Sequence, residues 1–163
     1  QENEGGIADA LSLAKEFAED DSVAVILGDN TSDADIFQAV QQFKEGALIF
    51  LKEVTDPERF GIATFDPADK SKIIKITEKP QTPDSKWAVT GVYIYDNQVF
   101  DFIDQIKPSA RGELEITDVN NKYVEKGQLA WSELKGYWWD AGTFDTLLEA
   151  NNYWAKKDKG QDK

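Results

Sequence analysis

Two aspartates follow apolar runs at distant places in this 163-residue chain. Residues 25–27 lead into Gly28 and Asp29, and an aromatic run near residue 138 leads into Asp140. In open α/β sheets, ligands bind outside the carboxyl ends of the strands. Two carboxylates that meet there could hold Mg²⁺ against a phosphate, because Mg²⁺ takes one or two carboxylates and fills its other positions with phosphate oxygens and water. The alternative is that Gly28 and Asp29 only form a turn, which both residue types favour.

A carboxylate and an ammonium end another strand-like run. Glu78 and Lys79 come directly before Pro80, which cannot donate to a sheet ladder and therefore places both side chains at a sheet rim. In that position Glu78 could bind sugar hydroxyls and Lys79 could bind a phosphate. The alternative is a solvated surface pair, which contributes little energy.

Arg111 opens a dense polar run, residues 111–118, that precedes an expected helix. Its planar guanidinium suits bidentate binding of a phosphate, and the other arginine of the sequence is Arg59. Glu115 and Asp118 lie near the expected helix start, where acidic side chains favour the helix dipole. We therefore interpret these two acids as capping residues and Arg111 as the candidate ligand.

Glycines interrupt two strand-like runs, and tryptophans flank the second aspartate. Gly61 and Gly91 stand where a glycine often marks the close approach of a ligand or of another backbone. Trp138 lies close to Asp140, and its ring could stack on the face of a sugar. Burial in the core is the alternative and the commoner fate of tryptophan.

The composition excludes several kinds of chemistry. With no histidine and no cysteine, the common zinc sites, imidazole catalysis and the usual serine hydrolase mechanism cannot be built from this chain. A net charge of −13 argues against binding nucleic acid or an anionic membrane through surface charge. No apolar run approaches the roughly 20 residues that a spanning helix needs. A hydrophobic fraction of 40% indicates a folded protein, and the lack of cysteine fits a reducing, cytoplasmic compartment.

Alternating helical and strand patterns must position these side chains. We expect a helix over residues 6–19, a strand over 22–27, a helix that Asp33 or Asp35 caps and that ends at Gly46, and a strand over 47–54, which together predict a parallel sheet. Runs at 61–65, 72–78 and 88–95 predict an antiparallel insertion. These runs are followed by a helix that Asn97 caps, a helix at 115–126, a strand at 128–134 and a helix from 143 to about 156.

The predicted class is α/β, with a mixed, mainly parallel sheet, flanking helices and an antiparallel insertion. We expect one domain over residues 1–155, because no linker or internal repeat divides the chain. Residues 156–163 are charged and without pattern, so they are expected to form a flexible tail.

Seven motifs, taken in order, resemble those of the glucose-1-phosphate thymidylyltransferases, a family of sugar nucleotidyltransferases. They are Gln1 with Gly6-Ile7-Ala8, Leu27-Gly28-Asp29-Asn30, Arg59-Phe60-Gly61, Glu78-Lys79-Pro80, Val89-Thr90-Gly91-Val92-Tyr93, Arg111-Gly112-Glu113-Leu114-Glu115-Ile116-Thr117-Asp118 and Trp138-Trp139-Asp140-Ala141-Gly142-Thr143. The similarity covers all but the charged tail. It implies the C-terminal part of a Rossmann-like nucleotidyltransferase fold. It also implies transfer of a thymidylyl group from dTTP to glucose 1-phosphate, giving dTDP-glucose for dTDP-rhamnose biosynthesis.

The resemblance implies a role for each matching residue. Asp29 and Asp140 are similar to the ligands of Mg²⁺, and Lys79 and Arg111 to the catalytic cations that hold the sugar phosphate. The implied substrate contacts are Gln1 and Gly6 for the thymine base, Phe60, Gly61, Glu78 and Val89 for the sugar, and Trp138 beside the second aspartate; Gly91 is expected to line the same cleft. Phe60 stands where the family often has tyrosine, which removes a hydroxyl contact.

One motif of the resembled family has no match. Its glycine-rich loop, Gly-x-Gly-Thr-Arg-x-x-Pro, binds the triphosphate and supplies the catalytic arginine. We therefore expect this chain to carry the sugar and metal half of the site and to have little activity alone. We also expect a homo-oligomer, or pairing with an N-terminal segment, because the strand near residues 23–27 would otherwise present an unpaired apolar edge. The alternatives are a non-catalytic sugar-phosphate binding module or fragment, and a glycosidase that acts through paired carboxylates.

Overall fold

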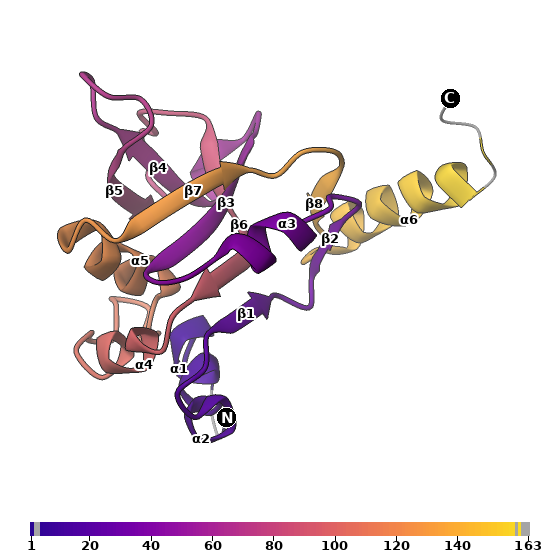
Figure 1. The fold of residues 1–163 in the computed structure, drawn as a ribbon. Coiled ribbons are helices and arrows are strands. Elements are labelled where there is room, and N and C mark those ends of the chain that lie inside the picture. Colours follow the sequence, from indigo (N-terminus) through magenta and orange to yellow (C-terminus); the bar gives the residue numbers. More distant parts are fainter. Residues whose placement is uncertain (2–3, 159, 161–163) are drawn as a thin grey trace.

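The computed structural model describes residues 1, 4–158 and 160 as a large sheet, a small two-stranded ribbon and helices on both faces of the sheet (Figure 1). The strands of the large sheet are β1 (Val23–Ile26), β3 (Ala47–Glu53), β4 (Gly61–Phe65), β5 (Ile73–Glu78), β6 (Trp87–Tyr95) and β7 (Leu129–Glu133). The ribbon consists of β2 (Asn30–Ser32) and β8 (Trp138–Asp140). The helices are α1 (Ile7–Ser12), α2 (Lys15–Ala18), α3 (Phe37–Gln42), η1 (Pro57–Arg59), α4 (Gln98–Ile103), α5 (Ile116–Glu125) and α6 (Phe144–Asp158).

The large sheet is mixed, and most of its pairings are antiparallel. Among the described residues its order is β5-β4-β6-β3-β7, and β1 also pairs with β6. The pairing of β3 with β7 is parallel, whereas β6 is antiparallel to β1, β3 and β4, and β4 is antiparallel to β5. The α/β class and the mixed sheet are confirmed, but the expectation of a mainly parallel sheet is wrong. Strands β1, β3 and β7 do run in one direction, yet β6 lies between β1 and β3.

Along one edge, β6 pairs with two different strands, β4 and β1. Near its start, Ala88 pairs with Ile62 of β4, and near its end residues 92–95 pair with β1. Just before the β1 pairing, the Gly91 carbonyl accepts a hydrogen bond from the Leu27 amide at 2.9 Å. Residues 89–91 therefore lie at a fork in the sheet, where the two neighbouring strands separate.

The side chains of β6 alternate between two apolar cores, as the period of a strand requires. Tyr93 and Tyr95 belong to the larger core, which also contains buried residues of α1, α4 and α5. Val92 and Ile94 belong to the smaller core, against which residues of α3 pack from the other face (Figure 1). Because β6 is buried on both faces, it is a rigid base for the fork.

Two predicted helices differ from the observed ones near the chain start. The helix expected over residues 6–19 is divided into α1 and α2. The helix expected to end at Gly46 ends earlier because Phe43 is already extended, with ψ of 137°. Ile36, rather than Asp33 or Asp35, is the N-cap residue of α3, although Asp35 Oδ1 accepts a hydrogen bond from the Phe37 amide at 2.9 Å.

Asn97 and Glu115 occupy the N-cap positions of α4 and α5, as predicted, but neither forms a capping hydrogen bond through its side chain. Asp96 instead accepts a hydrogen bond from the Gln98 amide through Oδ1, at 3.2 Å. At the chain end, α6 continues to Asp158 and therefore includes residues 156–158 of the predicted tail. Residues 159 and 161–163 of that tail lie outside the described residues.

The β2–β8 ribbon and α6 lie to one side of the large sheet (Figure 1). Asp33 joins them: its Oδ2 accepts hydrogen bonds from the Tyr153 hydroxyl and the Lys157 ammonium, each at 2.6 Å. Trp154 adds a hydrogen bond from its indole nitrogen to the Thr31 hydroxyl at 2.6 Å. Among the described residues, none of the helices combines the length and the hydropathy that crossing a membrane requires.

Candidate active site

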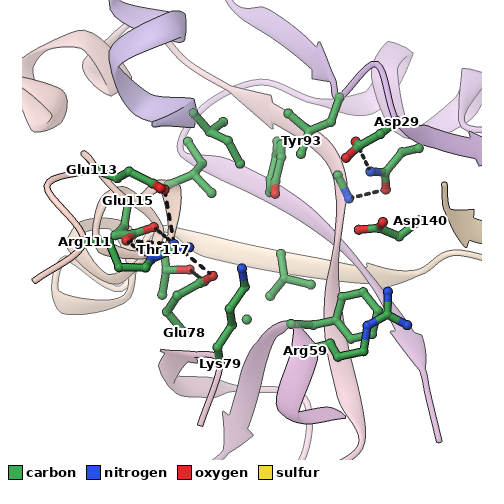
Figure 2. A pocket seen from close by; sticks show the side chains of 18 of the residues that line it. Asp29, Arg59, Glu78, Lys79, Tyr93, Arg111, Glu113, Glu115, Thr117 and Asp140 are labelled. Atoms are coloured by element: carbon green, nitrogen blue, oxygen red, sulfur yellow. Dashed lines mark hydrogen bonds and ion pairs between the residues drawn. The ribbon is translucent and has the colours of Figure 1, made fainter. Parts of the chain in front are cut away.

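A pocket with a cavity volume of about 240 Å³ opens at the fork beside β6 (Figure 2). Most of the predicted site residues line it, namely Asp29, Phe60, Gly61, Glu78, Lys79, Val89, Gly91, Arg111, Trp138 and Asp140. Its charged lining consists of five carboxylates and three cations: Asp29, Glu78, Glu113, Glu115 and Asp140, with Arg59, Lys79 and Arg111. The structure brings these side chains together, while the role of each stays a prediction. The excess of carboxylates means that an anionic ligand would be helped by a bound cation.

One end of the pocket is formed by the two aspartates, and we call it the carboxylate end. Asp29 precedes β2 and Asp140 ends β8, and the ribbon register pairs Asn30 with Asp140. A Cβ atom built on Gly142 would lie 3.0 Å from Asp140 Oδ1 and 3.2 Å from Asp29 Oδ2. The distance between Asp140 Oδ1 and Asp29 Oδ2 therefore cannot exceed the sum of these two distances. The backbone closes the same corner, since the Ala141 amide donates to the Asp29 carbonyl at 2.7 Å.

Asn30 fixes the carboxylate end to β6. Its Nδ2 donates to Asp29 Oδ1 at 2.9 Å, and its Oδ1 accepts hydrogen bonds from the Gly91 amide at 2.9 Å and the Trp138 indole at 2.7 Å. A Cβ atom on Gly91 would lie 2.6 Å from the Asn30 Cγ. Gly91 therefore marks a close approach, as its place in a strand indicated, but the approaching group is a side-chain amide. Sequence reasoning quoted Asn30 in a motif and gave it no role.

The two aspartates have the donor atoms that a hard divalent cation prefers. Among the described residues, the Oδ1 atoms of Asp29 and Asp140 accept hydrogen bonds, and their Oδ2 atoms accept none. The described residues contain no group of three or more acidic side chains that could hold a metal ion. Two carboxylates nevertheless fit Mg²⁺, which completes its octahedron with water and phosphate oxygens.

The opposite end, which we call the cationic end, begins with Glu78 on β5. Glu78 Oε2 accepts a hydrogen bond from the Thr117 hydroxyl at 2.5 Å. Gly61 is the register partner of Glu78, and a Cβ atom there would lie 3.2 Å from Thr117 Oγ1 and 3.3 Å from Glu78 Oε2. Gly61 therefore leaves room for this side-chain pair. Thr117 had no assigned role, although it belongs to the polar run that begins at Arg111.

Lys79 has an unusual backbone conformation at the rim of the pocket. Its φ of 41° lies in the left-handed region, which is uncommon for residues other than glycine, and the following proline restricts it further. The Lys79 amide donates to the Phe60 carbonyl at 3.0 Å, which helps to hold this conformation. The Lys79 side chain forms no ion pair with the described residues. Backbone strain of this kind clusters at functional sites.

Arg111 is surrounded by carboxylates rather than free. Its Nη2 lies 2.9 Å from Glu115, 3.3 Å from Glu113 and 3.8 Å from Glu78. The hydrogen bonds with Glu115, followed by the charges of the acids, raise the pKa of Arg111 above its usual value. Glu115 is the N-cap residue of α5, but its carboxylate forms no capping hydrogen bond and binds Arg111 and Ser109 instead. The crowding of acids around one arginine in the sequence was the signal for this contact.

Tyr93 lies between the two ends of the pocket (Figure 2). The residue is 3% exposed, and its ring stacks on that of Tyr95 with centroids 5.7 Å apart. Burial, and then the negative charges of Glu78 and Asp29, raise the pKa of Tyr93. The phenol is therefore neutral at physiological pH and can donate a hydrogen bond into the pocket.

An aromatic wall closes the side of the pocket near Asp140. The rings of Phe60 and Trp138 are tilted against each other with centroids 5.5 Å apart. Arg59 lies over the Phe60 ring at 5.2 Å and forms an ion pair with Asp56 at 2.7 Å. Sequence reasoning did not select Arg59, although it directly precedes the aromatic residue of its motif.

Gln1 and Gly6 do not belong to the lining of this pocket. Gln1 Nε2 donates to the Gly6 carbonyl at 2.9 Å and to Asp9 Oδ2 at 2.8 Å. Gly6 has a φ of 92°, and a Cβ atom there would lie 2.6 Å from the Leu114 carbonyl oxygen. Packing therefore explains this glycine, and its predicted contact with a base stays untested. Ile7, which follows Gly6, does line the pocket.

The fold is similar to that of a solved UDP-glucose pyrophosphorylase. That protein, in complex with UDP-glucose, superposes with a TM-score of 0.81 over 95% of this chain and 64% of that chain, at 23% identity. The chain belongs to the nucleotidyl transferase family, whose model matches residues 1–157.

Its similarity to glucose-1-phosphate thymidylyltransferases is confirmed. The enzyme of that name from Neisseria meningitidis serogroup A is 43% identical over 160 residues, which cover 94% of this chain and 54% of that protein. The Xanthomonas campestris pv. campestris (strain B100) enzyme of the same name is 40% identical over 159 residues, covering 94% of this chain and 53% of that protein. A Bacillus anthracis protein assigned to this activity, solved with sucrose, has a TM-score of 0.84 and 51% identity over 91% of this chain and 61% of that chain. The chain thus spans about half the length of the curated relatives it matches.

Proposed function

We propose that the chain forms the sugar-phosphate and metal part of an enzyme that transfers a thymidylyl group from dTTP to glucose 1-phosphate. The products would be dTDP-glucose and pyrophosphate, made in the cytoplasm for dTDP-rhamnose biosynthesis. The observation that supports this best is the placement of Asp29 and Asp140 in one pocket with Lys79 and Arg111. The names of the relatives support the same reaction.

In this proposal the cationic end binds the nucleophile. Lys79 and Arg111 hold the phosphate of glucose 1-phosphate, and Glu78 accepts hydrogen bonds from sugar hydroxyls. A phosphate oxygen attacks the α-phosphorus of dTTP, a new P–O bond forms, and the bond to the β-phosphate oxygen breaks. Pyrophosphate carries away the electron pair. The phosphate is already an anion, so no side-chain base is needed. The contribution of the protein is positioning and charge stabilisation.

Asp29 and Asp140 would hold Mg²⁺ through their free Oδ2 atoms. When bound, the cation would supply neutralisation of charge on the phosphates. Asn30 keeps the Asp29 carboxylate turned toward the pocket through its hydrogen bond to Oδ1. Trp138 and Phe60 would shield the same corner from water.

Turnover separates this proposal from its alternative, a non-catalytic sugar-phosphate binding module. The chain would be incubated with dTTP, glucose 1-phosphate and Mg²⁺, and dTDP-glucose and pyrophosphate would be quantified. Because no motif for the triphosphate was found in the sequence, we expect binding of glucose 1-phosphate with little turnover until an N-terminal segment is added. Binding that no added segment converts into turnover would favour the module. Absence of glucose 1-phosphate binding by calorimetry would contradict both.

The exposed edge of β1 supports a partner strand. Among the described residues β1 pairs with β6 alone, and Ile26 of β1 is 62% exposed. An open apolar edge is a template for pairing with another chain. We propose that a second copy or an N-terminal segment covers this edge. Light scattering would test it: association is expected, and a stable monomer of 18.3 kDa with cooperative unfolding would contradict it.

A further inference from the structure

The guanidinium of Arg111 has two edges, and one of them is already occupied. Its Nε and Nη2 donate to Glu115 Oε1 at 3.2 Å and 2.9 Å, and Nη2 also lies 2.9 Å from Glu115 Oε2. Within the described part of the chain, Nη1 has no hydrogen-bond partner. A ligand phosphate would therefore approach the edge formed by Nη1 and Nη2, which is a bidentate edge of its own.

Glu115 is built into the loop that carries Arg111. The residue is 9% exposed, and its Oε1 also accepts a hydrogen bond from the Ser109 hydroxyl at 2.7 Å. The Arg111 amide donates to the same hydroxyl oxygen at 3.2 Å. The loop is closed by hydrogen bonds from the Ser109 amide to the Glu113 carbonyl at 2.8 Å and from the Gly112 amide to the Ser109 carbonyl at 2.9 Å. Glu115 is therefore a fixed support for the guanidinium.

Glu113 is held differently. Its side chain is 34% exposed, and its Oε2 lies 3.3 Å from Arg111 Nη2 (Figure 2). Among the described residues this ion pair is the one polar interaction of the Glu113 carboxylate. Glu78, the third acid near the guanidinium, is farther away at 3.8 Å and is held by Thr117. Glu113 is thus the acid that can most readily move.

Three acids around one arginine give this cluster a net negative charge, which opposes the binding of an anion. We propose that Glu113 is an internal competitor, an autoinhibitory carboxylate that a substrate phosphate displaces from Arg111. Glu115 is the positioning residue that keeps the guanidinium aimed at the phosphate throughout. This inference rests on the proposed function, because it requires Arg111 to bind the substrate phosphate. It predicts opposite effects when the charge of each neighbouring acid is removed.

Titration with two phosphate probes, inorganic phosphate and glucose 1-phosphate, tests the inference by calorimetry or NMR. Glu113→Gln should tighten the binding of both probes roughly two- to fivefold, the strength of a partly exposed ion pair. Glu115→Gln should weaken binding about tenfold or more, because a buried charge-assisted support is lost. Glu125→Gln is the matched control, since it removes one charge at a carboxylate that is 65% exposed and pairs with Lys122. It should change binding less than about twofold.

A second readout follows the guanidinium directly. The chain has two arginines, so the Nε–Hε region of an NMR spectrum contains two signals. The Arg111 Hε should be protected from solvent exchange in the parent and in Glu113→Gln, and it should lose protection in Glu115→Gln. If Glu115→Gln does not fold, Ser109→Ala loosens the same carboxylate and should weaken phosphate binding in the same direction.

Unchanged or weaker binding of both probes by Glu113→Gln would overturn the competitor role. Equal binding by Glu115→Gln and the parent would overturn the positioning role. A failure of the proposed function would look different, because the parent would bind inorganic phosphate as tightly as glucose 1-phosphate. The relative affinities of Glu113→Gln, Glu115→Gln and the parent for inorganic phosphate would still test the inference. A parent that binds neither probe would overturn both, since Arg111 would then not be an anion site.

Discussion

The two ends of the pocket are held in place by different means. At the cationic end, Glu78 ends β5 and Arg111 precedes α5, elements whose side chains pack into the larger core. At the carboxylate end, Asp140 ends β8 of the small β2–β8 ribbon and Asp29 directly precedes β2. Side-chain hydrogen bonds of Asn30 and Asp33 attach this ribbon to β6 and α6. The carboxylate end therefore depends on these polar contacts and on Trp138 of β8, which is buried in the smaller core, while the cationic end is anchored in the larger core.

This difference suggests a division of labour between the two ends. At the cationic end, Glu115 fixes the Arg111 guanidinium, which can hold a phosphate without rearranging itself, and Glu113 is the neighbouring charge that we propose to move. At the carboxylate end, the Oδ2 atoms of Asp29 and Asp140 accept no hydrogen bond from the described residues, so they can adjust to a cation and to the ligand that the cation brings. Substitutions at the cationic end should therefore change ligand binding with little change in stability. Substitutions in the ribbon contacts should change both.

The largest expected effect is on binding at the cationic end. Arg111→Ala should weaken glucose 1-phosphate binding by about 1.5–3 kcal/mol, because a charge-assisted phosphate contact is lost. The side chain is 43% exposed, so the domain should remain folded. Calorimetry measures the affinity, and circular dichroism checks the fold. Unchanged affinity in a folded variant would remove Arg111 from the site.

A methyl group at Gly91 should disturb the carboxylate end. Gly91→Ala places a Cβ atom 2.6 Å from the Asn30 side chain, so we expect a loss of about 1–3 kcal/mol in unfolding free energy, the usual cost of overpacking. Divalent cation binding should weaken in the same variant, because Asn30 no longer fixes Asp29. Gly28→Ala is the matched control, because a Cβ atom there would meet no atom within 4 Å. Urea denaturation that shows equal stability for both variants would contradict this account of the ribbon.

The Asp33 contacts should make the ribbon sensitive to acid. Hydrogen bonds from Lys157 and Tyr153 lower the pKa of Asp33 to about 2. Because the folded-state pKa is depressed, this stabilisation is complete above the unfolded value near 4 and is lost as the pH falls toward 2. Allowing for partial solvent exposure, it amounts to about 1–2 kcal/mol. Asp33→Asn should therefore lower stability at pH 6 and lose this deficit near pH 2, as urea denaturation of both proteins would measure. A deficit that does not depend on pH would refute the assignment.

The smallest effect is expected outside both ends. Asp56→Asn removes the ion pair with Arg59, in which the side chains are 38% and 39% exposed. Exposed pairs contribute at most about 1 kcal/mol, so thermal unfolding should shift little. A large loss of glucose 1-phosphate affinity in this variant would show that the Arg59 corner belongs to the cationic end.

The sequence predicted features that depend on local residue patterns and missed features that depend on partners elsewhere in the fold. Strands with strong apolar patterns, such as β3 and β6, were predicted nearly to their ends, because burial dictates their residue types. The pairing partners of these strands were not predicted, because the period of apolar residues identifies a strand and not the strand beside it. The sequence therefore did not show that β6 lies between β1 and β3. Asp29 and Asp140 were selected from their places after apolar runs. Asn30 and Thr117 act through contacts with residues far away in the sequence, which local patterns do not encode. Glu115 binds Arg111 four residues before it, a local contact whose signal, the acids around one arginine, was present in the sequence but was interpreted as capping.

The most direct test of the account is whether one cation bridges Asp29 and Asp140 in the presence of a phosphorylated ligand. Mn²⁺ serves as the probe for Mg²⁺, and electron paramagnetic resonance counts the bound ions with and without dTDP-glucose. We predict that dTDP-glucose tightens Mn²⁺ binding, and that Asp29→Asn and Asp140→Asn each remove this effect. Asp35→Asn is the control and should leave it intact, because the Asp35 carboxylate binds the Phe37 amide and Asp35 does not line the pocket. Retention of the full effect in both pocket variants would contradict the central claim.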